Sequence, residues 1–299
     1  MMKKIAIIGS SAPSCIFAHY LKSKKFDVTI FESSNNIGGA WALDGMGSKY
    51  SNIISPLSKS EKKIFYKAVN FLKTYKVKFK KNFYKSLYSK RIVNSESCNL
   101  KGLYDLTKKK IKIKKMTAVK SIVEKDNSVL INNKFVFNYI FFPTYIKLKK
   151  IKIKYYKRNI KDISIPYLKM NKALHVRLFV KDLYKKNYKF KNLTLGPLDR
   201  FQIMDINKSI SQINGRVLLN WKKREKKAII KKILESVNFK KLIAIKFFVY
   251  RSCIRDAKQI KILKERIKKT KRVKYLETFT LLEFIRINIF ENKPLMSSK

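Results

Sequence analysis

The N-terminal segment alternates between apolar runs and polar turns in a way that predicts a strand, a helix and a second strand. IAIIG, residues 5–9, is a continuous apolar run that ends in glycine, which is typical of a strand buried on both faces. Residues 11–22 can form a helix, because serines are available as caps and Pro13 falls in the first turn. DVTIFE, residues 27–32, predicts a second buried strand. A β-α-β unit of this kind is half of a dinucleotide-binding fold.

The middle of the chain changes from helical to strand periodicity. Residues 58–79 carry apolar positions at helical spacing after a serine-led start, and predict a helix packed beyond the first domain. Residues 111–145 alternate or run apolar with β-branched and aromatic side chains. They predict strands joined by turns at Asp126-Asn127 and Asn132-Asn133.

In the C-terminal half the periodicity changes from that of strands to that of helices. Residues 172–221 contain three strand-like pieces, with turn signals at Gly196-Pro197 and Asn214-Gly215. The Lys-rich segments 222–248 and 252–270 carry apolar residues at helical intervals and predict helices. No internal repeat and no linker rich in Gly, Ser or Pro separates these segments.

The formal net charge of +52 would ordinarily favour nucleic acid or an anionic surface as a partner. Only 11 of the 71 basic residues are arginines, and the lysines extend along the whole chain. Residues with AT-rich codons are enriched throughout, so drift in an AT-rich genome explains the charge. Nucleic-acid readers rely on arginine for bidentate contacts. We therefore expect no specific nucleic-acid partner, although the positive field would attract an anionic small-molecule substrate.

Three widely spaced cysteines and two histidines predict no disulfide framework and no metal site. No apolar run approaches the ~20 residues that span a bilayer. The MMKK start resembles that of a signal peptide, but the strand, helix and strand that follow argue against one. We expect a cytoplasmic protein without a membrane span.

Glycines and an acid stand at fixed spacings along the N-terminal unit. Gly9 follows the first strand, Glu32 comes 23 positions later, and Gly38-Gly39 begins six residues after the acid. This arrangement resembles the FAD-binding fingerprint of the glutathione-reductase-type flavoproteins. It is closest to the branch that holds amine oxidases, phytoene desaturases, UDP-galactopyranose mutase and prenylcysteine oxidase. The resemblance implies that FAD is the cofactor.

Each position of the fingerprint has a physical reason. Gly9 allows the tight turn out of the strand, and the helix N-terminus that follows offers unpaired N–H groups to a pyrophosphate. Glu32 can accept hydrogen bonds from both ribose hydroxyls. Gly38 and Gly39 would let the backbone approach the cofactor without a Cβ in the way. Trp41, directly after GGA, could lie against the cofactor or simply staple the loop.

The glycine loop is degenerate, because Ser11 and Ser14 stand where the family has its second and third glycines. The Ser11 side chain would intrude on the pyrophosphate unless the loop shifts. Ser14 lies where helix and strand approach closely, and this change is mild because serine is small. A Rossmann-like half-domain without a ligand therefore stays open as an alternative.

A second segment, TAVKSIVEKDNSVLINNKFVFNYIFFPT at residues 117–144, is similar to the family's adenine-side strand, hairpin and return strand. In this resemblance Val119 takes the adenine-side position and Pro143-Thr144 closes the return strand. His175 and Arg177 share one face of a later strand. They could meet an anionic substrate, or they could belong to a solvated face.

The C-terminus departs from the family, whose members finish with a Gly-Asp motif before the last helix. Asp256, Glu277 and Glu283 are the nearby acids, and none stands after a glycine. The flavin end of the site is therefore less complete than the adenosine end.

Together these features predict an α/β fold, in which an FAD/NAD(P)-binding Rossmann-type domain carries a discontinuous mixed sheet-and-helix substrate or cap domain. Residues 1–57 and 108–147, with 272–299 as a further segment, would form the Rossmann domain. Residues 58–107 and 148–271 would form the cap.

Three functions follow from these predictions. The favoured one is an FAD-dependent oxidoreductase acting on a small or sugar-like substrate. The first alternative is a non-catalytic relative with weak or no dinucleotide binding, and the second is a basic polyanion-binding protein. Flavin carries the redox chemistry itself, so no residue is named as catalytic.

Overall fold

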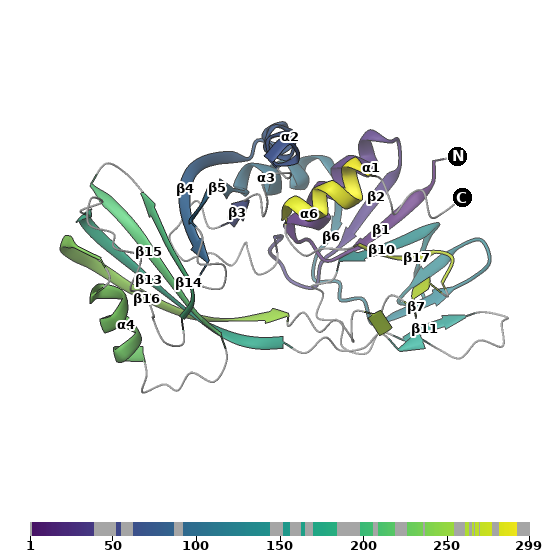
Figure 1. Ribbon diagram of the computed structural model, residues 1–299. Helices are drawn as coiled ribbons and strands as arrows, with labels where there is room; N and C mark the ends of the chain where they lie inside the picture. The colour runs from purple at the N-terminus through teal and green to yellow at the C-terminus, as the bar shows by residue number, and fades with distance from the viewer. Residues whose placement is uncertain are drawn as a thin grey trace.

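The protein consists of a parallel sheet covered by helices and of a long antiparallel sheet beside it (Figure 1). The α/β class predicted from the sequence is confirmed. The computed structural model describes residues 2–38, 52–54, 62–86, 92–143, 152–155, 163–164, 170–183, 198–205, 209–218, 226–235, 237–253, 261–262, 265, 267–268, 270–276 and 281–291.

The parallel sheet has five strands, and every neighbouring pair in it is parallel. The first strand lies at the centre, and later strands are added outward on both sides of it. This is the strand order of a Rossmann-type fold. From one edge to the other the strands are β17 (Val273–Leu276), β10 (Tyr139–Pro143), β1 (Lys4–Ile8), β2 (Asp27–Phe31) and β6 (Lys112–Lys114).

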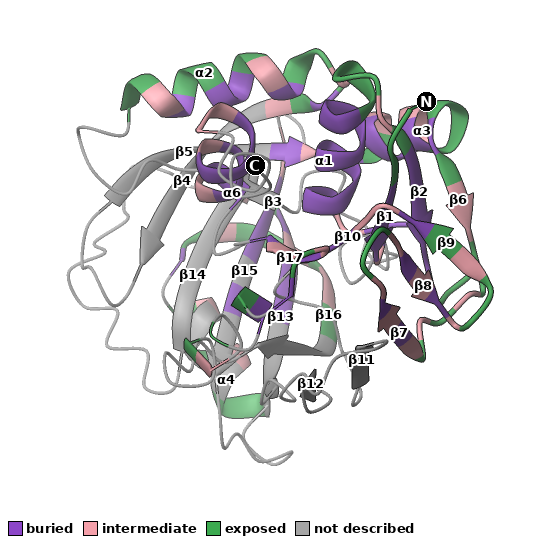
Figure 2. Cartoon of the chain, turned by 90° about the vertical axis from the view of Figure 1, so that its right-hand side faces the viewer, coloured by how far each residue is buried: buried purple, intermediate pink, exposed green. Residues whose placement is uncertain are grey.

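The predicted β-α-β unit is present, with α1 (Ala12–Ser23) between β1 and β2. Side chains alternate along β1, so Ile5 and Ile7 join the core beneath α1 while Ala6 and Ile8 join the core on the other face. Both faces of the strand are therefore buried, which explains its continuous apolar run. Figure 2 shows these elements almost wholly buried.

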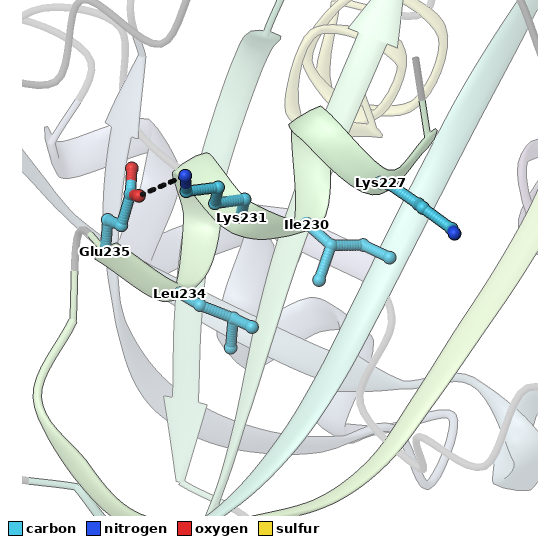
Figure 3. Close-up of a pocket in the computed structure, with 5 residues that line it drawn as sticks. All are labelled: Lys227, Ile230, Lys231, Leu234 and Glu235. Carbon is cyan, nitrogen blue, oxygen red and sulfur yellow. Dashed lines mark ion pairs between the residues drawn. The ribbon is translucent and has the colours of Figure 1, made fainter. Parts of the chain in front are cut away.

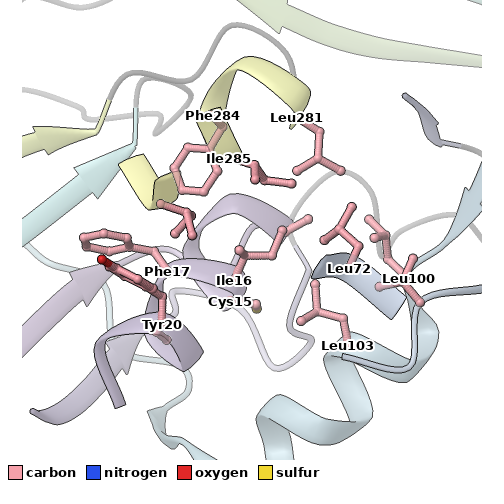
Figure 4. Packing of buried hydrophobic residues seen from close by; sticks show 14 of the residues in the cluster. Cys15, Ile16, Phe17, Tyr20, Leu72, Leu100, Leu103, Leu281, Phe284 and Ile285 are labelled. Carbon is pink, nitrogen blue, oxygen red and sulfur yellow. The ribbon is translucent and has the colours of Figure 1, made fainter. Parts of the chain in front are cut away.

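The helices on one face of the sheet share a single core (Figure 4). Phe17 of α1, Leu72 of α2 (Lys62–Lys73), Leu103 of α3 (Lys101–Lys110) and Phe284 of α6 (Leu281–Ile285) all belong to it. A π-helical turn, Arg286–Phe290, follows α6. Both α2 and α3 come from the segment 58–107, which the sequence analysis assigned to the cap, and they contribute to the same core as α1.

A three-stranded meander covers the opposite face of the parallel sheet. It contains β7 (Ser121–Glu124), β8 (Val129–Ile131) and β9 (Phe135–Phe137), and β11 (Lys152–Tyr155) and β12 (Ile163–Ser164) extend it beyond β7. The predicted turns are confirmed. Asn132 and Asn133 have φ values of 52° and 54°, the left-handed pair that a type I′ turn requires.

The outermost strand of the parallel sheet is attached through Glu124 of the meander. This buried carboxylate accepts hydrogen bonds from the backbone N–H groups of Lys271 and Arg272, at 2.7 and 3.2 Å, just before β17 begins. The Arg272 side chain adds a hydrogen bond to the carbonyl of Asp126 at 2.7 Å. Residues from the C-terminal part of the chain thereby complete the sheet that contains the N-terminal strand.

The second sheet has seven antiparallel strands, with α4 (Lys226–Glu235) next to it (Figure 1). The second strand from one edge is β13 (Met170–Leu183), which pairs with β15 (Ile210–Leu218) and with the edge strand β16 (Phe239–Cys253). The remaining strands continue outward from β15 as β14 (Leu198–Asp205), β4 (Lys78–Ser86), β5 (Ile92–Asn99) and β3 (Asn52–Ile54).

Two local predictions are wrong in this sheet. Asn214 and Gly215 do not form a turn: they lie within β15, opposite Arg177 and Val176 of β13. Residues 239–248 do not continue a helix, because they form β16. In both places pairing with β13 satisfies the backbone over many residues, and this outweighs the local turn or helix preference.

Candidate functional site

The predicted glycine loop connects β1 to α1 with a tight turn. Gly9 has a φ of 81°, which favours glycine, and its N–H donates to the carbonyl of Phe31 at 2.8 Å. Ser11 is the N-cap of α1, and its side chain makes no capping hydrogen bond. Its hydroxyl instead lies 3.1 Å from that of Ser14. The first-turn N–H groups of α1 therefore have no side-chain cap from Ser11.

Glu32 lies at the carboxyl end of β2, beside this loop, and is buried with 6% exposure. Its Oε2 accepts from the backbone N–H of Ser10 at 3.0 Å and from the Ser10 hydroxyl at 2.5 Å. Its Oε1 accepts from the Ser34 N–H at 2.8 Å, with the Ser34 and Ser33 hydroxyls at 3.0 and 3.3 Å. Both carboxylate oxygens of Glu32, the residue predicted to bind the ribose, thus accept hydrogen bonds from protein groups.

These hydrogen bonds keep Glu32 ionised. Burial by itself would raise the pKa of the carboxyl, but hydrogen bonds from Ser10 and Ser34 outweigh it, and the pKa lies below its usual value. The folded protein therefore gains stability from the Glu32 carboxylate at neutral pH. It loses this contribution as the pH falls through the lowered pKa.

Ser10 is a site residue that the sequence analysis missed. Besides its two contacts with Glu32, its carbonyl and its hydroxyl each accept from the N–H of Gly38, at 2.9 and 3.0 Å. Gly38 has a φ of 108°, so the first glycine of the pair does occupy a conformation that favours glycine. The only available signal was a small hydroxyl residue directly after Gly9.

The predicted adenine-side segment runs next to the acid. The N–H of Thr117 donates to the Glu32 carbonyl at 2.8 Å, and the N–H of Met116 donates to the Ser34 carbonyl at 3.3 Å. Val119 follows and packs partly buried against the core shared with the meander. An open hollow of about 610 Å³ lies along this segment, lined by Met116, Thr117, Ala118, Lys120, Ser121 and Asn132.

The side chain of Asn132 holds this segment in place from the meander. Its Oδ1 accepts from the N–H groups of Lys120 and Ser121, at 2.7 and 3.2 Å. Its Nδ2 donates to the carbonyl of Ala118 at 2.9 Å. The type I′ turn that was predicted as a hairpin connection therefore also shapes the wall of the candidate site.

Other predicted residues are placed differently. Gly39 and Trp41 lie outside the described residues, as do Asp256 and Glu277 of the C-terminal acids. His175 belongs to β13, and its side chain is likewise outside the description. The Arg177 side chain is only 6% exposed, so the solvated-face alternative is wrong for this residue.

A second hollow lies along α4 and is lined by Lys227, Ile230, Lys231, Leu234 and Glu235 (Figure 3). Two of these residues form an exposed ion pair of 3.8 Å between Lys231 and Glu235. The helix lies beside the antiparallel sheet, apart from β1, α1 and β2 (Figure 1). This hollow contains none of the predicted nucleotide-binding residues.

Two further observations concern metal sites and membrane-spanning helices. Within the described ranges, no group of three or more His, Cys, Asp or Glu side chains could hold a metal ion. Among the same residues no helix is long and apolar enough to cross a bilayer.

The adenosine half of a dinucleotide fits the residues present. The helix N-terminus has no serine cap and no acidic side chain in its first turn, so its N–H groups can face a pyrophosphate. Glu32 and Thr117 are neighbours, joined by a backbone hydrogen bond, at the carboxyl end of the sheet, and this is where open α/β sheets bind ligands. Glu32, the start of α1 and the segment 116–119 are thus the groups that would hold the adenosine diphosphate of FAD.

Comparison with known proteins agrees with this fold. A family model described as the NAD(P)-binding Rossmann-like domain matches residues 7–45. This range contains the end of β1, the whole of α1 and β2, and Glu32 and Gly38. No curated protein sequence matches the chain.

Several solved structures have a similar fold. A triple mutant of putrescine oxidase, from a redesign of its cofactor binding, matches with a TM-score of 0.63 at 8% identity, over 100% of this chain and 99% of that chain. L-amino acid deaminase from Proteus vulgaris matches with a TM-score of 0.51 at 11% identity, over 100% and 91%. The Diels-Alderase PyrE3 matches with a TM-score of 0.49 at 8% identity, and this chain spans 59% of its length. The family model and the match with putrescine oxidase agree with an α/β fold that contains a Rossmann-type unit.

Proposed function

We propose that the protein is an FAD-dependent oxidoreductase that acts on a small-molecule substrate. The observation that carries this proposal is the meeting of a glycine turn, an uncapped helix N-terminus and a buried ionised Glu32 at one edge of a Rossmann-ordered sheet. The fold similarity to putrescine oxidase and L-amino acid deaminase supports it.

In this proposal the chain binds and orients the cofactor, and bound flavin supplies the electron transfer. The N–H groups at the start of α1 stabilise the negative charge of a pyrophosphate. Glu32 accepts a hydrogen bond from the ribose, and its buried position shields that bond from water. The cap that covers the substrate would be built on the antiparallel sheet, with Arg177 as a buried positive charge for an anionic group.

A second function, a non-catalytic relative with weak or no dinucleotide binding, is favoured by a specific observation. Serine hydroxyls already donate hydrogen bonds to the carboxylate oxygens of Glu32. In the glycine loop, the side chains of Ser11 and Ser14 take up space where the family has glycines. The absorption spectrum of the purified protein separates the two functions. Flavin bands near one equivalent per chain support the oxidoreductase, and a colourless protein that does not take up added FAD supports the relative.

Replacement of Glu32 by Ala tests the assignment of the ribose ligand. A hydrogen bond to a charged acceptor contributes about 1.5–3 kcal/mol, so the affinity for FAD should fall at least tenfold. Fluorescence titration measures this affinity, and circular dichroism with thermal melting shows whether the variant is folded.

Asp27→Ala is the matched control, because Asp27 is an exposed carboxylate at the opposite end of the same strand. It should leave the affinity for FAD unchanged. A folded Glu32→Ala variant that binds FAD as tightly as the wild type would refute the assignment.

A further inference from the structure

The two carboxylate oxygens of Glu32 are held in different ways. Oε2 accepts from the N–H and the hydroxyl of Ser10, and Oε1 lies within hydrogen-bond distance of the Ser34 N–H and of the Ser34 and Ser33 hydroxyls. A carboxylate oxygen has room for about two donors. A ribose hydroxyl can bind only where a protein donor leaves. The question is which of the two oxygens releases a donor at the lower cost.

The Oε2 side is fixed. The Ser10 hydroxyl donates to Oε2 at 2.5 Å and accepts from the Gly38 N–H at 3.0 Å, while the Ser10 N–H also donates to Oε2. Ser10 is 1% exposed. Removing its hydroxyl from Oε2 would disturb a buried donor and the contact with Gly38 together, which is costly.

The Oε1 side can exchange its partner. Ser34 is exposed, and its hydroxyl lies 3.0 Å from Oε1 but 2.6 Å from the carbonyl of Asn36. A serine hydroxyl has one hydrogen, so it can donate to only one of these acceptors at a time. When it turns to Asn36, Oε1 keeps the Ser34 N–H at 2.8 Å and only the more distant Ser33 hydroxyl at 3.3 Å, so no buried group is left unpaired.

We propose that the Ser34 hydroxyl competes with a ribose hydroxyl for Oε1 of Glu32 and thereby sets the affinity for the nucleotide. Ser10 keeps Oε2 occupied, so Oε2 is not open to the ribose. This inference rests on the proposed function, because it concerns the same nucleotide site. A ribose hydroxyl takes the place of the Ser34 hydroxyl at Oε1, and the Ser34 hydroxyl then donates to the Asn36 carbonyl alone. The ribose is then held through one carboxylate oxygen rather than two.

Calorimetric titration with ADP tests the proposal, because ADP carries the ribose and diphosphate without the flavin. Ser34→Ala removes the competing hydroxyl and keeps the N–H that donates to Oε1 at 2.8 Å. It should bind ADP about threefold to tenfold more tightly than the wild type, since only mobile water then has to leave Oε1. Ser33→Ala is the matched control, because its hydroxyl is farther away at 3.3 Å, and it should gain less than twofold.

Two further measurements show that the gain acts through the ribose and Glu32. With 2′,3′-dideoxy-ADP, which lacks both hydroxyls, Ser34→Ala and the wild type should bind equally. In a Glu32→Ala background, adding Ser34→Ala should change the affinity for ADP less than twofold.

The outcomes separate this inference from the proposed function. If the wild type binds ADP and FAD while Ser34→Ala binds ADP no more tightly, the inference is wrong and the proposed function stands. If neither the wild type nor Ser34→Ala binds ADP or FAD, both are wrong. A gain that persists with the dideoxy probe also overturns the inference, because the hydroxyl would then act on another part of the ligand.

Discussion

Ser11 adopts a backbone conformation that any residue can take, although glycine was expected at this position. Its φ and ψ are −61° and 164°, the ordinary extended conformation of an N-cap. The serine therefore imposes no backbone strain. What distinguishes it from glycine is its side chain, whose hydroxyl lies against Ser14 at the start of α1.

Ser11→Gly should tighten FAD binding, because it removes a Cβ and a hydroxyl from the surface that a pyrophosphate would approach. Glycine adds freedom to the unfolded chain, so the free energy of unfolding should fall by up to about 1 kcal/mol. Fluorescence titration reports the affinity, and thermal melting without ligand reports the stability. If both Ser11→Gly and Ser14→Gly leave FAD binding undetectable, the loop is a structural turn and the non-catalytic function is preferred.

At the scale of elements, α1 and α3 are joined by a buried polar contact. His19 Nε2 lies 3.0 Å from the hydroxyl oxygen of Thr107, and that hydroxyl donates to the carbonyl of Leu103 at 2.7 Å. Because the hydroxyl has one hydrogen, Nε2 must be the donor to Thr107. Burial first, and then the charges of Lys110 and Lys22, lower the pKa of His19 to about 4.

This contact should make the packing of α1 against α3 sensitive to acid. The unfolded chain protonates His19 near its usual pKa of 6.5, whereas the folded protein resists protonation down to about 4. The free energy of unfolding should therefore fall as the pH drops from 6.5 to 4, by up to about 3 kcal/mol. His19→Gln keeps a donor for Thr107 and should flatten this part of the profile in urea denaturation. An unchanged slope would show that His19 does not titrate as described.

At the scale of the whole molecule, positive charge covers separate elements instead of forming one site. Lys62 on α2, Lys108 on α3 and Lys240 on β16 are all exposed; α2 and α3 cover the parallel sheet, whereas β16 belongs to the antiparallel sheet. Such charge attracts polyanions without distinguishing one base sequence from another.

Binding to duplex DNA should therefore be weak, independent of sequence and lost steeply as salt rises. Fluorescence anisotropy with two unrelated duplexes, at low and at physiological salt, measures this. The two duplexes should give the same affinity at each salt concentration. Tight binding to one of them at physiological salt would support the polyanion-binding function instead.

The sequence alone determined the β-α-β unit, the glycine turn and the position of Glu32. These features follow from local chemistry: strands buried on both faces need continuous apolar runs, and Gly9 needs a left-handed φ. The meander was predictable for the same reason, because its Asn132-Asn133 turn depends on the two residues themselves.

Only the tertiary structure decided features that depend on partners far away in the sequence. Asn214-Gly215 lies in a strand because β13 and β14 pair with it on both sides. Ser10 became a site residue because folding brings it to Glu32, 22 positions away, and to Gly38. A hydrogen bond between distant residues leaves no periodicity in the sequence, and its partner is fixed only when the sheet has set which loops meet at its edge.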